Sequence, residues 1–221
     1  LAQSNGVKTL VYSLSGMGKT VLCSTAPAPV ILSAESGLLS LAKVIRATGK
    51  DLPVAVIRNI ADLQRAYQMS VSPQWSGFAT ICLDTITEIA EVVLASEMAK
   101  TRDPRKAYGE MITQMIALVK LFRDIPGKNV YFSCKLEQTK DGTTGAIRNE
   151  PGMPGQKLGG QLAYLFDEVF QLFVYRDAQG VDHRVLRTQP DMQNEAKDRS
   201  GMLAPFEPAD LTLIFNKIQQ K

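Results

Sequence analysis

Residues 7–24 contain the pattern that most restricts how this chain can fold: an apolar strand, a loop of small residues and the start of a helix. Val7 to Tyr12 is typical of a buried strand, Ser13 to Gly18 is the loop, and a helix is expected from Lys19. The segment Ser13 to Thr20 is close to the phosphate-binding pattern G-x-x-x-x-G-K-[ST]. In that pattern, backbone N–H groups and the positive N-terminal end of the helix hold a phosphate group.

The residue types of this loop fit the chemistry of a nucleoside triphosphate. Gly16 and Gly18 let the backbone approach the phosphates, and Lys19 would bridge the β- and γ-phosphate oxygens. The Thr20 hydroxyl would ligate Mg²⁺. Ser13 stands where the pattern has Gly, which requires backbone angles that a residue with a Cβ can adopt. The residues predicted to surround the phosphates of ATP are Ser13, Ser15, Gly16, Met17, Gly18, Lys19, Thr20 and Val21.

Two carboxylates at the ends of apolar runs are candidates for the rest of the site. Asp84 ends the run 79–84 and is predicted to support Mg²⁺ together with Thr20. Glu35 ends the run 30–35 and is predicted to orient an attacking water as general base. Glu88 lies one helical turn beyond Asp84 and competes with Glu35 for this role.

Strand and helix patterns alternate along the chain, which predicts one α/β domain over residues 1–221 with a mainly parallel central sheet flanked by helices. Residues 169–175 and 185–188 are expected to form a C-terminal antiparallel hairpin, and residues 208–219 the last helix. Residues 142–160 hold six of the 16 glycines, so a glycine-rich mobile loop is expected over about 139–160.

Composition restricts the class of protein. Hydrophobic residues make up 45% and charged residues 21% of the chain, which is typical of a globular protein. Three scattered cysteines argue against a disulfide framework and favour the cytoplasm, and burial is expected for each of them. No apolar run reaches the roughly 18 residues that a membrane span needs, so no membrane partner is expected. His183, the only histidine, is expected to have no metal or catalytic role.

The order of these motifs resembles the RecA-like branch of phosphate-loop ATPases. Ser33–Ala34–Glu35 is similar to the Asp-Ala-Glu of that family, so the resemblance gives Glu35 the role of the catalytic glutamate. Ser133–Cys134–Lys135 stands where the family has a polar sensor of the γ-phosphate, a role that Ser133 or Lys135 would fill. The stretch 139–162 is similar to the glycine-rich DNA-binding loop and the helix that follows it.

Near the C-terminus, Lys197–Asp198–Arg199 resembles the Lys-x-Arg finger of the RadA and hexameric helicase relatives, which reaches into a neighbouring subunit's nucleotide. Side chains two residues apart on an extended segment point the same way, so both cations can converge on a γ-phosphoryl group. The resemblance therefore implies a homo-oligomer, either a ring or a filament. Most of the chain resembles phage-encoded RecA-like proteins of the single-strand annealing and recombination type, which places it in the host cytoplasm.

Clustered cations predict single-stranded DNA as a partner. The net charge of the chain is only +3, and residues 100–106 alone carry a local +3 in what is expected to be a loop. Aromatic support is limited to Tyr108, because Tyr164, Phe166, Phe170 and Phe173 have the spacing of core residues. The predicted phosphate-contacting cations are Lys100, Arg102, Arg105, Lys106, Lys140, Arg148 and Lys157.

Together these patterns predict a Mg²⁺-dependent ATPase, stimulated by DNA, that acts in phage recombination or single-strand annealing. Two alternatives remain open. One is a module that binds nucleotide and assembles without turnover, and the other is a small-molecule nucleotide kinase. The sequence contains no arginine-rich lid of the kind that a nucleotide kinase needs.

Overall fold

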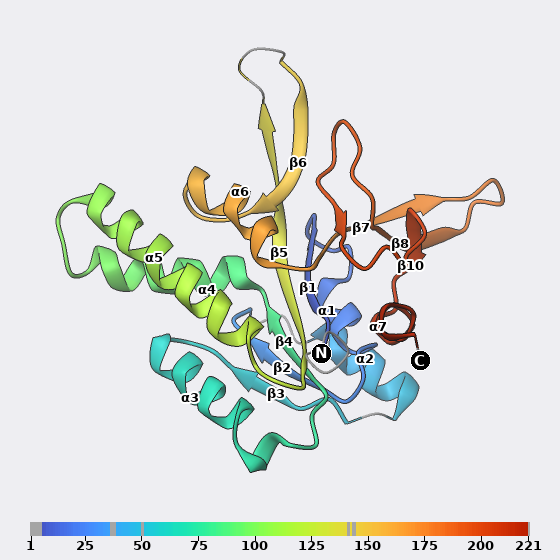
Figure 1. Cartoon of the computed structure of the whole chain (residues 1–221), viewed down its shortest axis with the longest axis horizontal. Helices are drawn as coiled ribbons and strands as arrows, with labels where there is room; N and C mark the ends of the chain where they lie inside the picture. The colour runs from blue at the N-terminus through green and yellow to red at the C-terminus, as the bar shows by residue number, and fades with distance from the viewer. Residues whose placement is uncertain (1–5, 36–38, 50, 141, 143–144, 221) are drawn as a thin grey trace.

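A computed structural model describes residues 6–35, 39–49, 51–140, 142 and 145–220, and the side chains of these residues except Gln156 and Lys157. Its centre is a ten-stranded sheet in the order β10-β8-β7-β1-β5-β4-β2-β3, with β6 paired to β5 and β9 to β7 (Figure 1). The strands are β1 (Lys8–Ser13), β2 (Pro29–Ser33), β3 (Val54–Val56), β4 (Thr80–Asp84), β5 (Asn129–Lys140), β6 (Ile147–Gly152), β7 (Glu168–Arg176), β8 (Asp182–Arg187), β9 (Lys197–Asp198) and β10 (Phe206–Pro208). The helices are α1 (Lys19–Cys23), α2 (Leu39–Thr48), α3 (Ile60–Ser70), α4 (Ile86–Met98), α5 (Pro104–Arg123), α6 (Gln156–Leu165) and α7 (Leu211–Gln219), with a 3-10 turn at Pro73–Trp75.

The middle of the sheet is parallel, which confirms the predicted fold class. β1 pairs in parallel with β5 and β7, β4 pairs in parallel with β2 and β5, and β2 with β3. The carboxyl ends of β1, β2, β4 and β5 therefore meet at one edge, where loops in such sheets bind ligands. The predicted C-terminal antiparallel hairpin is also present, since β7 pairs with β8 and β8 with β10.

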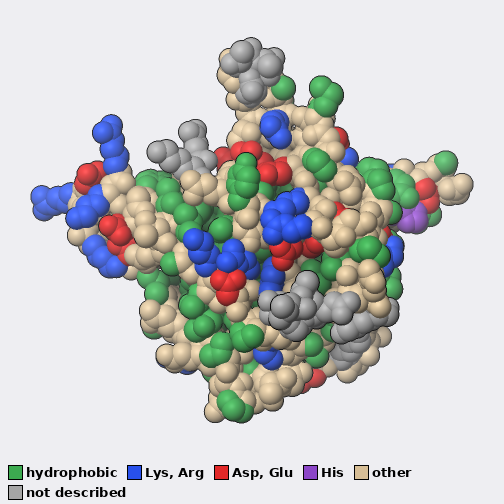
Figure 2. All heavy atoms as spheres, in the orientation of Figure 1, with side chains coloured by type: hydrophobic (Ala, Val, Ile, Leu, Met, Phe, Trp, Pro, Cys, Tyr) green, Lys and Arg blue, Asp and Glu red, His purple; other side chains and the backbone are tan. Residues whose placement is uncertain are grey.

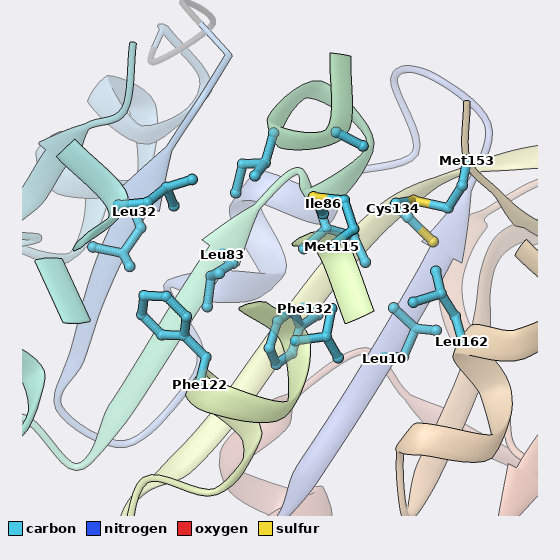
Figure 3. Close-up of a cluster of buried hydrophobic side chains, with 14 of the residues drawn as sticks. Leu10, Leu32, Leu83, Ile86, Met115, Phe122, Phe132, Cys134, Met153 and Leu162 are labelled. Carbon is cyan, nitrogen blue, oxygen red and sulfur yellow. The ribbon is translucent and has the colours of Figure 1, made fainter. Parts of the chain in front are cut away.

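Helices cover both faces of the sheet. Leu10 and Tyr12 of β1 point to one face and pack with Met111 and Met115 of α5, in the cluster that Figure 3 shows. Val11 points to the other face and packs with residues of α1 and α7. Strands buried on both faces stay fixed relative to one another, so the loops that leave their carboxyl ends are held in place. Cys23, Cys82 and Cys134 are free and buried, as predicted.

The described part of the stretch 139–160 consists mainly of strands and a helix, not of the loop that its composition predicted, and residues 141 and 143–144 lie outside the described part. β5 continues to Lys140 and returns as β6, so the two form an antiparallel hairpin that projects from the body of the protein, and α6 begins at Gln156 (Figure 1). Two of the glycines serve close packing. A Cβ on Gly152 would lie 3.0 Å from Cβ of Glu137, and one on Gly159 would lie 2.6 Å from the carbonyl oxygen of Pro151. Glycine content could not distinguish close contact from mobility.

Two further expectations were wrong. Tyr164 has the spacing of a core residue but is 82% exposed, because α6 turns this position away from the sheet, whereas Phe166 and Phe170 are buried. Phe173 is only partly buried. The cation-rich segment 100–106 is only partly a loop, because α5 begins at Pro104, where Asp103 caps it by accepting a hydrogen bond from the Arg105 N–H.

Among the described residues, no helix has the length and apolar character of a membrane span.

The contact at Gly159 leads to a stability prediction. Gly159→Ala would push a methyl group into the Pro151 carbonyl and should lower the free energy of unfolding by about 1–3 kcal/mol. Gly160→Ala is the matched control, because no atom lies within 4 Å of its added Cβ. That control should raise stability, by up to about 1 kcal/mol, since Ala favours helix. Urea unfolding of both variants measures the difference, and equal stabilities would contradict the packing role of Gly159.

Candidate functional site

The phosphate loop leaves β1 at the carboxyl edge of the sheet. Gly16 and Gly18 have φ values of 78° and 103°, in the left-handed region that favours glycine. Ser13 is the last residue of β1 and is buried. Among the described residues, the only ones other than glycine with positive φ are Ala28 and Gln220. Ser13 therefore fits its position without the angles that require glycine, and its departure from the motif leaves the loop intact.

Lys19 is folded against the loop that it follows. Its Nζ donates to Ser13 O, Ser13 Oγ and Leu14 O, each at 3.2 Å. Burial lowers the pKa of Lys19, and the nearby carboxylates of Glu35 and Asp84 oppose this shift. The loop and Lys19 line a cavity of about 470 Å³ that Glu35, Lys135 and Arg184 also reach. We call this cavity, lined by Ser13, Ser15, Gly16, Gly18, Lys19, Thr20 and Val21 on the loop side, the phosphate cleft.

Asp84 lies at the bottom of the site, with both carboxylate oxygens bonded. The Thr20 hydroxyl donates to Oδ2 at 2.7 Å, and the Ser133 hydroxyl donates to Oδ1 at 2.5 Å. These three side chains come from α1, β4 and β5. The predicted metal residues Thr20 and Asp84 thus meet, and they offer only oxygen ligands, which suits Mg²⁺. No group of three or more His, Cys, Asp or Glu in the described parts could hold a metal ion.

Glu35 and Glu88 have different partners. Ser33 of β2 is level with Asp84 of β4, and Glu35 follows Ser33 by two residues. The Glu35 Oε1 accepts a hydrogen bond of 3.1 Å from the Thr85 hydroxyl. Glu88 forms an ion pair with Lys135, and this pairing raises the pKa of Lys135. Of the two carboxylates, only Glu35 is among the described residues that line the phosphate cleft.

The remaining loop residues support the shape of the cleft. Met17 packs its side chain into the core between the sheet, α1 and α7, and the Tyr131 hydroxyl donates to Lys19 O at 3.2 Å. The first turn of α1 is therefore fixed from beneath by β5. Ser133 contacts Asp84 rather than the open cleft, whereas Lys135 lines it. Ser133 therefore holds Asp84 in place, and Lys135, whose ammonium is paired with Glu88, is the one of the two candidates that lines the cleft.

Comparison with known proteins gives a family for this chain and a solved structure with a similar course of the backbone. The family model described as "AAA domain" matches residues 5–200. The chain belongs to this AAA domain family. Among solved structures, "Crystal structure of the RadB recombinase" aligns with 16% identity over 85% of this chain and 83% of that chain, with a TM-score of 0.49. No curated protein matches the sequence. Membership of the AAA domain family indicates a nucleotide-binding domain of the ATPase type.

One residue of this AAA domain was not predicted to be at the site. Arg184 of β8 donates its Nε–H to Met17 O at 3.0 Å, and it lines the phosphate cleft. A Cβ on Gly18 would lie 3.2 Å from Arg184 Nε, so the guanidinium rests directly on the loop. No sequence pattern indicates this contact, because it depends on β8 lying beside β7 and β7 beside β1.

Lys197 and Arg199 lie away from the phosphate cleft of their own chain. β9 pairs with the start of β7, whose Glu168 is level with Thr9, so both cations are near the amino end of β1. The Lys197 ammonium donates to Ala163 O at 2.9 Å and Phe166 O at 2.5 Å, at the end of α6. Burial lowers its pKa. Arg199 pairs with Asp167 at 2.7 Å, and its side chain remains 60% exposed. Only Arg199 is thus exposed enough to meet a neighbouring subunit without unmaking buried contacts.

The predicted DNA-contacting cations occupy two regions. Lys100, Arg102, Arg105 and Lys106 are exposed where α4 joins α5, and Figure 2 shows Lys and Arg side chains gathered at that end of the molecule. Lys140 and Arg148 lie on the hairpin, and the side chain of Lys157 is outside the described part. Tyr108 of α5 lies against the start of α6, because its ring is 3.2 Å from where a Cβ on Gly155 would be.

Proposed function

We propose that this chain binds ATP with Mg²⁺ and hydrolyses it. The observation that carries the proposal is the convergence at the phosphate cleft: Lys19 and Glu35 line one cavity, and Thr20 is bonded to Asp84 at its base. Cation, carboxylate base and metal-supporting oxygens are the groups that phosphoryl transfer to water needs. AAA domain membership supports the nucleotide-binding part of this proposal.

Each group then has one role. The loop N–H groups and Lys19 hold the phosphates, and the Lys19 ammonium exchanges its bonds to Ser13 and Leu14 for bonds to phosphate oxygens. Thr20 and Asp84 would hold Mg²⁺, which supplies charge neutralisation on the phosphates when bound. The Thr85 hydroxyl fixes the Glu35 carboxylate, and Glu35 takes the proton of the attacking water. Glu88 stays bound to Lys135 and takes no part in proton transfer.

Substitution of the carboxylates tests the assignment of the base. Glu35→Gln should lower the ATPase rate by at least about 100-fold because the general base is lost, while ATP binding is retained. Glu88→Gln is the matched control and should keep most of the rate. Phosphate release under saturating ATP and Mg²⁺ measures turnover, and titration calorimetry measures binding. Normal turnover in Glu35→Gln would show that another residue is the general base.

Substitution of the loop lysine is a separate test. Lys19→Ala should lose ATP binding as well as turnover, because the cation that holds the phosphates is removed.

We also propose that single-stranded DNA binds along α5, α6 and the β5–β6 hairpin and stimulates hydrolysis. The cations at the start of α5 and on the outer half of the hairpin face solvent, and the hairpin continues the strand that carries Ser133. Glu137 and Glu150 are level with each other near the base of the hairpin, and two carboxylates there disfavour a phosphate. Phosphates would therefore contact the outer half of the hairpin, near Lys140 and Arg148. The exposed ring of Tyr108 offers the stacking surface that the sequence predicted, and the exposed ring of Tyr164 offers a second one that it did not.

Salt dependence tests the DNA surface. Arg105→Ala removes one predicted phosphate contact, so it should weaken binding to single-stranded DNA and reduce the slope of log affinity against log salt concentration by about 0.7. Lys120→Ala is the matched control, since it removes an exposed cation from the opposite end of the same helix. Fluorescence anisotropy with labelled oligonucleotides at several salt concentrations gives both slopes. Identical slopes for the two variants would contradict a contact at Arg105.

Assembly is the third part of the proposal. Arg199 lies at the amino edge of the sheet and cannot serve the cleft at the carboxyl edge of the same chain. In a homo-oligomer, ring or filament, it would reach a neighbour's γ-phosphate, with Lys197 positioning the segment against α6. This arrangement would make hydrolysis depend on assembly.

Mixing of two inactive variants tests a shared site. Lys19→Ala lacks its own phosphate cation, and Arg199→Ala should lose about 1,000-fold in rate because the neighbour's transition state is not neutralised. An equal mixture should recover part of the activity, since some clefts of Arg199→Ala chains then meet an intact Arg199. A mixture as inactive as its components would contradict the shared site.

These activities together suit a role in phage recombination or single-strand annealing, where nucleotide-dependent assembly on DNA is required. Two other outcomes of the same assays would replace this proposal. Tight ATP binding without hydrolysis, with or without DNA, would indicate an assembly module without turnover. Transfer of phosphate to a nucleotide instead of water would indicate a kinase.

A further inference from the structure

Three carboxyl groups lie close together at the amino edge of the sheet, away from the phosphate cleft. Asp167 and Glu168 stand at the start of β7, and Asp198 of β9 is level with Glu168 across the β7–β9 pair. Asp167 and Glu168 also line a hollow of about 410 Å³, together with Arg199 and Ser200. Glu168 is only 1% exposed. Burial beside other carboxylates disfavours the charged form of a carboxyl group, so the partners of each group decide which one holds a proton.

Asp198 is surrounded by hydrogen-bond donors. Its Oδ1 accepts from the Ser200 hydroxyl at 2.5 Å and from the Gly201 N–H at 3.0 Å. Its Oδ2 accepts from the Leu203 N–H at 3.1 Å. These three bonds fold residues 198–203 around the Asp198 side chain, and we call this segment the Asp198 turn. In every one of them Asp198 is the acceptor, which is how an ionised carboxylate bonds.

Glu168 has no comparable set of donors. Its Oε1 accepts one hydrogen bond of 3.3 Å from the Ser200 N–H, and within the described part of the chain no group donates to its buried Oε2. The nearby cations are bonded to other groups. Arg199 pairs with Asp167, and Lys197 donates to carbonyl groups at the end of α6. A charged Glu168 would therefore be a buried carboxylate with one weak partner and no cation of its own.

The other elements around Glu168 bring no charge to it. Thr9 of β1 is level with Glu168, and its buried hydroxyl also lacks a partner among the described residues. The remaining described residues that line the hollow, before β1, after Gly201 and at the end of α7, are uncharged. Burial, with the neighbouring carboxylate of Asp198, raises the pKa of Glu168 to about 8. Asp198 is within hydrogen-bonding reach, and a bond between two carboxyl groups requires a proton on one of them.

We propose that Glu168 is a neutral acid near pH 7 and donates its proton to the Asp198 carboxylate, so that this bond holds β9 and the Asp198 turn against β7. Loss of the proton would leave two adjacent carboxylates without a cation between them, and their repulsion would loosen the turn. Arg199 belongs to this turn, so Glu168 is a positioning residue for Arg199. The bond needs neither nucleotide nor a neighbouring chain, so this inference goes beyond the proposed function and is tested apart from it.

The pH dependence of stability has a definite sign. Between about pH 4.5 and 8 the folded chain keeps a proton on Glu168 that the unfolded chain has released. The stability that this proton supplies is complete below that range, and it is lost as the pH rises through the range toward 8.

Unfolding by urea at several pH values tests the protonation of Glu168. Glu168→Gln replaces the acid by a neutral amide of similar shape, which can still donate to Asp198. Between pH 5.5 and 7.5, the equilibrium constant for unfolding should rise about 50-fold more in the wild type than in Glu168→Gln. Glu91→Gln is the matched control, because it removes an exposed carboxyl group of α4, and it should follow the wild type. Equal pH dependence in the wild type and Glu168→Gln would overturn the proposal.

Hydrogen exchange tests whether the proton holds the Asp198 turn. After correction for the intrinsic rate, the N–H groups of Ser200, Gly201 and Leu203 should lose protection by about 10-fold between pH 7 and 9 in the wild type and keep it in Glu168→Gln. Unchanged protection in the wild type would overturn the positioning role.

A spectroscopic test keeps the proposal falsifiable if Glu168→Gln does not fold. The infrared band of a protonated carboxyl group should be present in the wild type at pH 7 and lost by pH 9, and Asp198→Asn should move this loss to lower pH, because the neighbouring charge is removed. Absence of the band at pH 7, or a loss that Asp198→Asn does not move, would overturn the proposal. None of these measurements uses ATP or DNA, so their failure leaves the proposed function unaffected, and a chain without ATPase activity leaves this inference unaffected.

Discussion

The Asp84 carboxylate, held between the hydroxyls of Thr20 and Ser133, is the interaction on which the rest of the site depends. One oxygen accepts from the first turn of α1 and the other from β5, so a single buried group joins the phosphate loop to two strands of the sheet. Burial removes water from the Asp84 carboxylate, and these two hydroxyls supply hydrogen bonds that replace it. The same bonds hold in place the Thr20 and Asp84 oxygens that we propose support Mg²⁺.

The sheet gives this interaction its rigidity. β5 lies between β1 and β4, so Ser133 stands between the phosphate loop and Asp84, and Tyr131 of the same strand supports Lys19 from below. β5 then continues without interruption into the hairpin that carries Lys140. One strand thus runs from the base of the phosphate cleft to the surface proposed to meet DNA. β5 is paired with β4 as far as Phe132, with β1 as far as Lys135, and with β6 from Lys135 to Lys140.

Cationic side chains lie at both edges of the sheet. Lys19 and Arg184 lie at the carboxyl edge of the sheet, while Arg199 pairs with Asp167 near the amino edge. One chain therefore presents a cleft for phosphates at one edge and an exposed guanidinium at the other. Repetition of that arrangement from chain to chain is what the proposed assembly requires.

Local patterns in the sequence determined the phosphate loop, the α/β class, the parallel centre of the sheet, and Glu35 and Asp84 at strand ends. These features depend on periodicity and on the spacing of a few residues, which a single sequence contains. Only the tertiary structure decided between Glu35 and Glu88 for the cleft, placed Arg184 on the loop and exposed Tyr164. It also turned a glycine-rich stretch into a hairpin, because Gly152 and Gly159 meet the backbone or side chain of residues that only strand pairing and helix packing bring close. Contacts across strand register and between sheet edges join residues far apart in the chain, and no local pattern records them.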